Sequence, residues 1–226
     1  MASIYDLKPA FQGLLRPLCR GLARLGVTAN QVTVAAMLLS LATGAFLAAR
    51  PGARGPLLLV PAVLFVRMAL NAIDGMLARE HGMKSALGGL LNEIGDVVSD
   101  AALYLPLALV PGIEPWAIVV AVLLAGLTEM TGVVAVQIGA SRRYDGPMGK
   151  SDRAFVFGVV CLALGVGART GWWTDFVIGA ILAALAVTVL NRGRKALREV
   201  KTLTPGPSPG PPSPTSGRGE SGRRKR

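Results

Sequence analysis

Long apolar segments recur along this chain and constrain its fold more than any other feature. A helix that spans a membrane needs roughly 20 apolar residues to cross a hydrocarbon core of about 30 Å. Six segments meet or approach that length: 32–49, 57–78, 87–110, 113–138, 155–168 and 172–190. Hydrophobic residues make up 52% of the 226 residues and charged residues 16%, which leaves too little polar sequence to cover a soluble globule. The sequence therefore predicts an all-α membrane protein with about six transmembrane helices.

The ends of the chain differ from this apolar region. Residues 1–25 interleave lysine and arginine with leucine and phenylalanine, a spacing typical of an amphipathic helix on the membrane surface. Residues 26–200 form the predicted membrane domain. Residues 201–226 are rich in Pro, Gly, Ser and basic side chains, and we expect a disordered tail because few apolar groups offset the entropy of ordering.

Basic residues between the segments predict the orientation. If the N-terminus is cytoplasmic, the cytoplasmic loops and the C-terminal tail collect most of the lysine and arginine, as the positive-inside rule requires. Both termini are then cytoplasmic, and we expect the inner membrane of a bacterium. The net charge of +11 favours contact with anionic lipid head groups. Nucleic acid is disfavoured as a partner because the basic residues flank the spans and form no single soluble face.

Two polar runs lie inside the apolar segments, where an ionised group is costly unless it is paired, hydrated or bound to an ion. In the first run, Asn71 and Asp74 share a helix face. In the second, Gly88, Asn92, Asp96 and Asp100 follow at four-residue intervals. Two antiparallel helices joined by a short loop would bring these faces together. Clustered oxygen ligands without histidine or thiolate are typical of a site for Mg²⁺ or Mn²⁺.

The two runs together resemble the signature of the CDP-alcohol phosphatidyltransferases, DxxDGxxAR followed by GxxxDxxxD. The resemblance rests on Asp74-Gly75, Ala78-Arg79, Gly88 and Asp96 at matching gaps, and residues 26–33 are similar to the family's approach to its first span. Members of this family are membrane enzymes that join a CDP-activated lipid, such as CDP-diacylglycerol, to an alcohol and release CMP.

The resemblance also implies roles for individual residues. It implies nucleotide binding at Asp74, Gly75, Ala78, Arg79 and Gly88, and it implies that Asp96 accepts the proton of the acceptor hydroxyl. The implied ligands of a catalytic Mg²⁺ or Mn²⁺ ion are Asn71, Asp74, Asn92 and Asp96, with Asp100 as a further candidate.

Two positions depart from the family signature. Asn71 and Asn92 stand where the family has its first and third aspartates. An amide oxygen still coordinates a hard cation, but each exchange removes one negative charge. Glu93 and Asp100 are close enough in sequence to restore charge, so one bound ion, two or none remain open alternatives.

A second polar cluster, residues 142–153, follows the fourth segment. Lys150 and Arg153 are three residues apart, and we interpret them as ligands for the phosphate of an acidic acceptor or a lipid. The alternative is that this basic loop only fixes the topology. For Glu129 in the fourth segment we favour a hydrogen bond that packs helices, and for Arg67 in the second segment the sequence identifies no partner.

Other functions remain open. Intramembrane carboxylates also occur in small ion- or proton-coupled transporters. A catalytically silent relative that binds CDP-lipid would explain the two asparagines, and simple pairing of the acids with Arg67, Arg79 or Lys84 would explain the charges. The acceptor alcohol is not identified by the sequence, and a homodimer is an open alternative.

Overall fold

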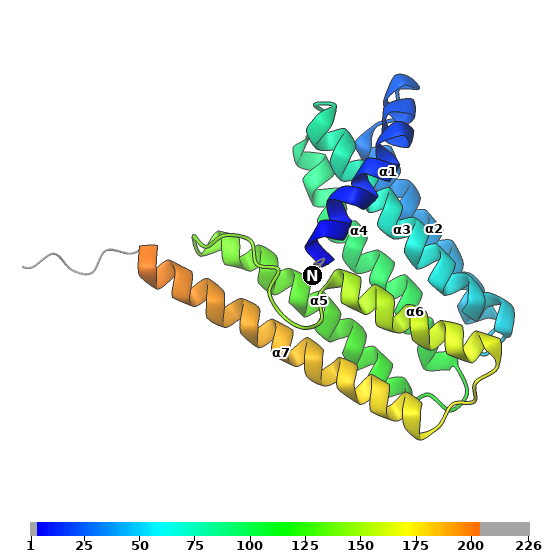
Figure 1. Cartoon of the computed structure of the whole chain (residues 1–226). Helices are drawn as coiled ribbons and strands as arrows, with labels where there is room; N and C mark the ends of the chain where they lie inside the picture. The colour runs from blue at the N-terminus through cyan, green and yellow to red at the C-terminus, as the bar shows by residue number, and fades with distance from the viewer. Residues whose placement is uncertain (1–3, 204–226) are drawn as a thin grey trace, which may run out of the picture.

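Seven α-helices and a short 3₁₀ helix, η1, follow one another along residues 4–203, the part of the chain that the computed structural model describes, with side chains from residue 10 onward (Figure 1). They are α1 Ile4–Arg24, α2 Ala29–Ala49, α3 Arg54–Glu80, α4 Ala86–Tyr104, η1 Leu105–Leu109, α5 Pro115–Gln137, α6 Lys150–Val166 and α7 Trp172–Leu203. No strand occurs within these residues. The predicted all-α fold class is confirmed.

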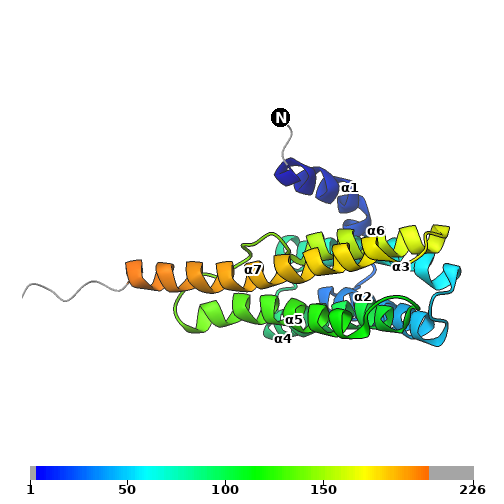
Figure 2. The same cartoon turned by 90° about the horizontal axis from the view of Figure 1, so that it is seen from below.

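The bundle consists of two layers of helices. Seen from below, α3, α6 and α7 lie in one layer and α2, α4 and α5 in the other, while α1 lies outside both (Figure 2). Helix α2 packs against α3 and α4, α5 packs against α7, and α3 packs against α6. Helix α1 contacts α3, and its buried Cys19 contrasts with its exposed Leu14 and Leu18, as the predicted amphipathic helix requires.

Four helices, α2, α3, α5 and α7, are long and apolar enough to cross a membrane. Helices α4 and α6 also belong to the bundle, but α6 has 17 residues and the polar run interrupts α4. Length and composition therefore support four of the six predicted spans. The protein is an integral membrane protein, and its outer faces carry exposed apolar side chains such as Phe65, Leu123 and Phe176.

The third and sixth predicted segments differ from the helices observed. The expected span 87–110 divides into α4 and η1, because Pro106 follows directly and proline removes a backbone donor from a helix interior. The sixth segment extends as α7 to Leu203, three residues into the predicted tail. The rest of that tail, from residue 204, lies outside the described residues.

Three hydrophobic clusters hold the elements together, and the smallest joins Ala135, Ala140 and Ala196. The largest joins η1 and the helices from α2 to α7, and in it Tyr104 stacks on Phe157 with ring centroids 4.1 Å apart. A further cluster lies under α1 and contains Cys19, Ile73 and Met76. It fixes α1 against the end of α3 that carries the first polar run.

Caps set the starts of two helices beside that end. The Thr28 hydroxyl accepts from the Gln31 amide at 3.3 Å while the Gln31 side chain accepts from the Thr28 amide at 2.9 Å, so a capping box begins α2. Ser85 begins α4 by accepting from the Gly88 amide at 3.0 Å. Both starts adjoin the same cavity.

Candidate functional site

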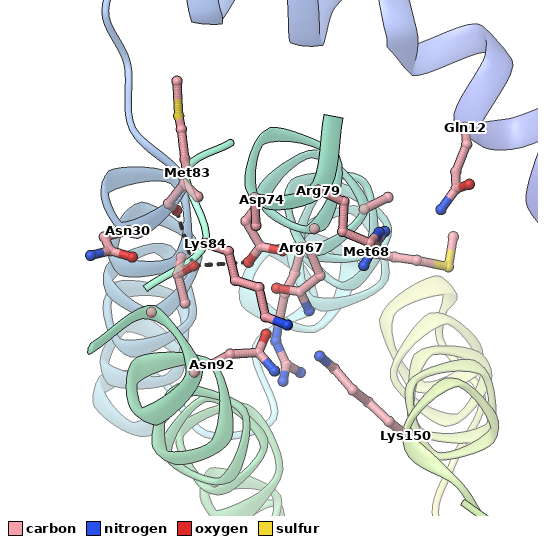
Figure 3. A pocket seen from close by; sticks show the side chains of 18 of the residues that line it. Gln12, Asn30, Arg67, Met68, Asp74, Arg79, Met83, Lys84, Asn92 and Lys150 are labelled. Atoms are coloured by element: carbon pink, nitrogen blue, oxygen red, sulfur yellow. Dashed lines mark hydrogen bonds between the residues drawn. The ribbon is translucent and has the colours of Figure 1, made fainter. Parts of the chain in front are cut away.

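A cavity of about 1030 Å³ opens between α1, the starts of α2, α4 and α6, and the polar end of α3 (Figure 3). Its wall is oxygen-rich and basic on the side of α4 and α6, and apolar around Leu64, Phe65 and Met68. The site residues predicted from the sequence that line it are Asn71, Asp74, Gly75, Ala78, Arg79, Gly88, Asn92 and Lys150. The structure thus brings both polar runs together across α3 and α4.

Asp74 is the acidic side chain in this wall. Its residue is 7% exposed, and its Oδ2 accepts a hydrogen bond of 2.9 Å from the Thr33 hydroxyl of α2 (Figure 3). Lys150 and Asp96 lie within range of electrostatic interaction with it. Asp74 therefore has a fixed orientation in the cavity wall.

The two motif glycines lie where a side chain would collide with neighbours. A Cβ at Gly75 would lie 3.0–3.1 Å from the guanidinium nitrogens of Arg79, and one at Gly88 would lie 2.7 Å from the Asn30 amide oxygen. Both glycines therefore keep space open beside polar groups in the cavity wall. That a ligand approaches the backbone there stays a prediction.

Asp96 lies behind the wall and is held by two cations. Its Oδ1 forms an ion pair with the Lys150 ammonium from the start of α6 and lies 3.4 Å from the Arg67 guanidinium. Arg67 also donates to the Asp96 backbone carbonyl at 3.2 Å. The Asp96 side chain is 18% exposed. Its ion-pair partner Lys150 lines the cavity, so the carboxylate lies one side chain away from it.

Asp100 and Arg153 face the bundle interior rather than the cavity. Arg153 is 1% exposed and donates to Asp100, Thr128 and Glu129 at 2.9–3.0 Å. Asp100 also binds Arg67 at 2.6 Å. The structure therefore corrects the expectation that Lys150 and Arg153 present one phosphate-binding surface, since the guanidinium of Arg153 already has protein partners on three sides. It also places Asp100 outside the cavity wall.

Glu129 of α5 forms helix-packing hydrogen bonds, as the sequence suggested, and its partners are arginines of α6 and α7. Arg153 donates to it at 2.9 Å, Arg192 of α7 lies at 3.5 Å and Arg142 at 3.6 Å. Arg192 is 2% exposed and also donates to the Thr128 carbonyl. The interior position of Arg192 was not predicted from the sequence, although a basic residue after an apolar run was a visible signal.

The loop before α6 is tied to the end of α7. Lys195 donates to Asp145 at 2.6 Å and Arg143 donates to it at 3.0 Å, and these two cations lower the pKa of the Asp145 carboxyl below its ordinary value. Ser141 donates to Glu199 through its backbone and its hydroxyl, both at 2.9 Å. These contacts give much of the basic loop a structural role.

The oxygen ligands of the cavity wall suit one hard cation better than two. Asn71, Asp74 and Asn92 offer oxygen ligands to the cavity, but Asp96 is held by Lys150 and Arg67. Among the described residues, no group of three His, Cys, Asp or Glu side chains is placed to hold a metal ion. The residues therefore fit a single ion at Asp74, completed by the amide oxygens of the asparagines.

Comparison with known proteins gives the chain its relatives. The chain is 45% identical over 197 residues to the inner membrane protein YnbA of Escherichia coli, covering 86% of this chain and 96% of that protein. It is 30% identical over 163 residues to the archaetidylinositol phosphate synthase of Pyrococcus horikoshii, covering 72% and 74%.

Solved structures share the fold. The phosphatidylinositol phosphate synthase PgsA1 of Mycobacterium tuberculosis with CDP-DAG bound superposes with a TM-score of 0.66 at 22% identity, over 82% of this chain and 92% of that one. Its complex with manganese and citrate gives 0.63 at 23% identity, over 82% and 88%. The family model for CDP-alcohol phosphatidyltransferase matches residues 26–190, and this chain belongs to that family.

Proposed function

We propose that this protein transfers a phosphatidyl or other substituted phosphate group from a CDP-alcohol such as CDP-diacylglycerol to an alcohol acceptor, releasing CMP, in phospholipid biosynthesis. The observation that carries the proposal is the cavity itself, where buried Asp74, the glycines at 75 and 88 and the basic side chains share one wall beside an apolar surface. A diphosphate fits the polar side and a lipid chain fits the apolar side. The relatives named above support the same reaction class.

Each residue of the cavity has its own role in the proposed reaction. Gly75 and Gly88 admit the diphosphate to the backbone, and Arg79 lies beside Gly75 to bind its oxygens. Asp74, with Asn71 and Asn92, would hold a Mg²⁺ or Mn²⁺ ion, which when bound screens the charge of the phosphates. Asp96 takes the proton of the acceptor hydroxyl as the new oxygen–phosphorus bond forms and the bond to CMP breaks.

Lys150 is placed to bind an acidic acceptor. Its ammonium lines the cavity and pairs with Asp96, so an acceptor phosphate bound there would bring its hydroxyl to the proton-accepting carboxylate. Without an acceptor, the Lys150 ammonium is paired with the Asp96 carboxylate. Binding of the acceptor therefore has to draw Lys150 away from Asp96. The Asp96 carboxylate then becomes free to accept the proton only when an acceptor is bound.

The basic residues of the loops also bear on where the protein lies in the cell and how it is oriented. We expect the inner membrane of a bacterium, with the cavity and both termini on the cytoplasmic side, where CDP-activated lipid and a soluble acceptor meet. The basic loops on that side support this orientation.

The second candidate function is a CDP-lipid-binding protein without turnover. Asn71 and Asn92 favour it, because they remove two negative charges from the ion site. One assay separates the two functions. The full chain in lipid nanodiscs is incubated with CDP-diacylglycerol, Mg²⁺ or Mn²⁺ and a panel of alcohols that includes glycerol phosphate, inositol phosphate and serine, and CMP is measured.

Metal-dependent CMP release that needs one of the alcohols supports the transferase. Saturable binding of CDP-diacylglycerol without CMP release supports the silent relative. Neither binding nor release would contradict both functions and reopen the transporter alternative.

A further inference from the structure

The charge balance of the cavity wall is the reverse of what an ordinary two-ion site needs. Its one acidic side chain among the described residues is Asp74, and its basic side chains are Arg67, Arg79, Lys84 and Lys150. Two divalent ions would add four positive charges to a wall in which cations already outnumber carboxylates. Like charges confined in one cavity repel each other strongly when water is excluded. The wall is thus built to receive an anion directly.

Lys84 is a basic residue of this wall for which the proposed reaction has so far given no role. It lies in the short turn between α3 and α4, and its side chain extends into the cavity near Asn92 and opposite Lys150 (Figure 3). Arg67 and Lys150 are paired with Asp96. Lys84 forms no hydrogen bond or ion pair with the side chains that the structure describes, those of residues 10–203. An ammonium that faces a second ammonium across a cavity, without a carboxylate of its own, is placed to bind an anion that enters between them.

The asparagines explain why such a cation is tolerated there. Aspartates at positions 71 and 92 would attract a second metal ion, whereas amide oxygens bind a divalent cation more weakly because they carry no charge. A lysine ammonium supplies positive charge and three donors without needing carboxylate ligands. The two asparagines and Lys84 in the same wall therefore act together: the asparagines weaken binding of a second metal ion, and Lys84 supplies positive charge in its place.

We infer that Lys84 contacts the diphosphate of the CDP-alcohol directly and takes the place of one of two divalent cations, so that the site works with a single bound metal ion. This inference rests on the proposed function and adds a substrate-binding residue and a metal stoichiometry to it. Lys150 keeps its place at the acceptor side of the cavity, while Lys84 acts on the nucleotide side.

The test measures binding and not turnover. The full chain in detergent is titrated with Mn²⁺ at saturating CDP, free Mn²⁺ is followed by electron paramagnetic resonance, and CDP affinity is measured by calorimetry. We expect one Mn²⁺ per chain. Lys84→Met should weaken CDP binding at least about tenfold, as loss of a charge-assisted hydrogen bond implies. Lys84→Arg should retain most of the affinity, and the matched control Lys201→Met, at the exposed end of α7, should retain all of it.

A combined variant sharpens the result. Lys84→Met together with Asn71→Asp and Asn92→Asp should bind a second Mn²⁺, because the cavity then has the carboxylates and lacks the competing ammonium. Two Mn²⁺ ions in the wild type, or unchanged CDP affinity in Lys84→Met, would overturn the inference and leave the proposed function standing. Absence of CDP binding in the wild type with Mn²⁺ present would overturn both.

Discussion

At the scale of single residues, Asp74 and Asp96 are two carboxylates with different surroundings. Asp74 faces the cavity and has Thr33 as its hydrogen-bond donor, whereas Asp96 lies behind the wall between Lys150 and Arg67. The first is suited to hold a cation, and the second is suited to accept a proton once Lys150 moves to the acceptor. In the proposed reaction the two carboxylates would therefore have distinct tasks.

Removing either charge should stop the reaction without unfolding the protein. We expect Asp74→Asn and Asp96→Asn each to lower CMP release about a hundredfold or more, the range for loss of a catalytic acid–base group or a metal ligand. The measurement is CMP release in nanodiscs after gel filtration has shown an unchanged elution volume. Asp175→Asn, at the exposed start of α7, is the control. Wild-type turnover in both cavity variants would contradict the assignment.

Arg153 should act on stability rather than on a ligand. Arg153→Met leaves Asp100 and Glu129 without their shared guanidinium, and breaking a buried ion pair from one side costs about 3–5 kcal/mol. Thermal unfolding can be followed with a thiol-reactive dye because Cys19 and Cys161 are both buried. We expect a large fall in the unfolding temperature, whereas exposed Arg169→Met should leave it unchanged. A raised KM for the acceptor at unchanged stability would restore the phosphate-ligand role.

At the scale of elements, close helix contacts determine where the cavity forms. Helices α2 and α4 approach each other at Gly44, where a Cβ would overlap the carbonyl oxygen of Ala102. This contact holds the starts of both helices at the same level, so that Thr33 of α2 reaches Asp74 and Asn92 of α4 faces the cavity. A small residue far from the cavity thus sets the geometry of its wall.

Gly44→Ala should therefore separate the two helices. Because the obstructing atom is backbone, the collision cannot be relieved by a side-chain rotation, and overpacking of this kind costs about 1–3 kcal/mol or more. We expect a lower unfolding temperature together with weaker CDP binding. Gly179→Ala in α7 is the matched control, since a Cβ there meets nothing within 4 Å and alanine favours helix. Equal behaviour of the two variants would show that α2 and α4 can adjust.

At the scale of the whole molecule, the sequence predicted the helical class and the residues of the cavity wall better than the links between the helices. Apolar segments and helical spacing sufficed to place Asp74 and Asn92 on facing surfaces. Spacing within one helix, however, carries no information about which distant helix packs against it. The partners of Arg67 on α4 and of Glu129 on α6 and α7 depend on that packing. The interior position of Arg153 was missed for the same reason.

The orientation of the molecule is open to a direct test. We expect the α3–α4 turn to be cytoplasmic and the α6–α7 turn to lie on the opposite side, because basic residues gather on the first side. His81→Cys and Arg169→Cys each place an exposed thiol in one of these turns. A membrane-impermeant maleimide should label Arg169→Cys in intact spheroplasts and His81→Cys only after lysis. The wild type, whose cysteines are buried, is the unlabelled control. Reversed labelling would invert the topology.

The ion pairs of Arg67 also bear on how the protein is made. Arg67 lies in α3, so it leaves the ribosome before Asp96 and Asp100 of α4 and well before Lys150 of α6. An arginine at the centre of a helix that enters the membrane alone costs about 2.5–3.5 kcal/mol on insertion scales. Helix α3 would carry that cost until its acidic partners arrive. Biogenesis is therefore expected to proceed through α3 and α4 entering the bilayer together as a hairpin, with the guanidinium already matched to Asp100.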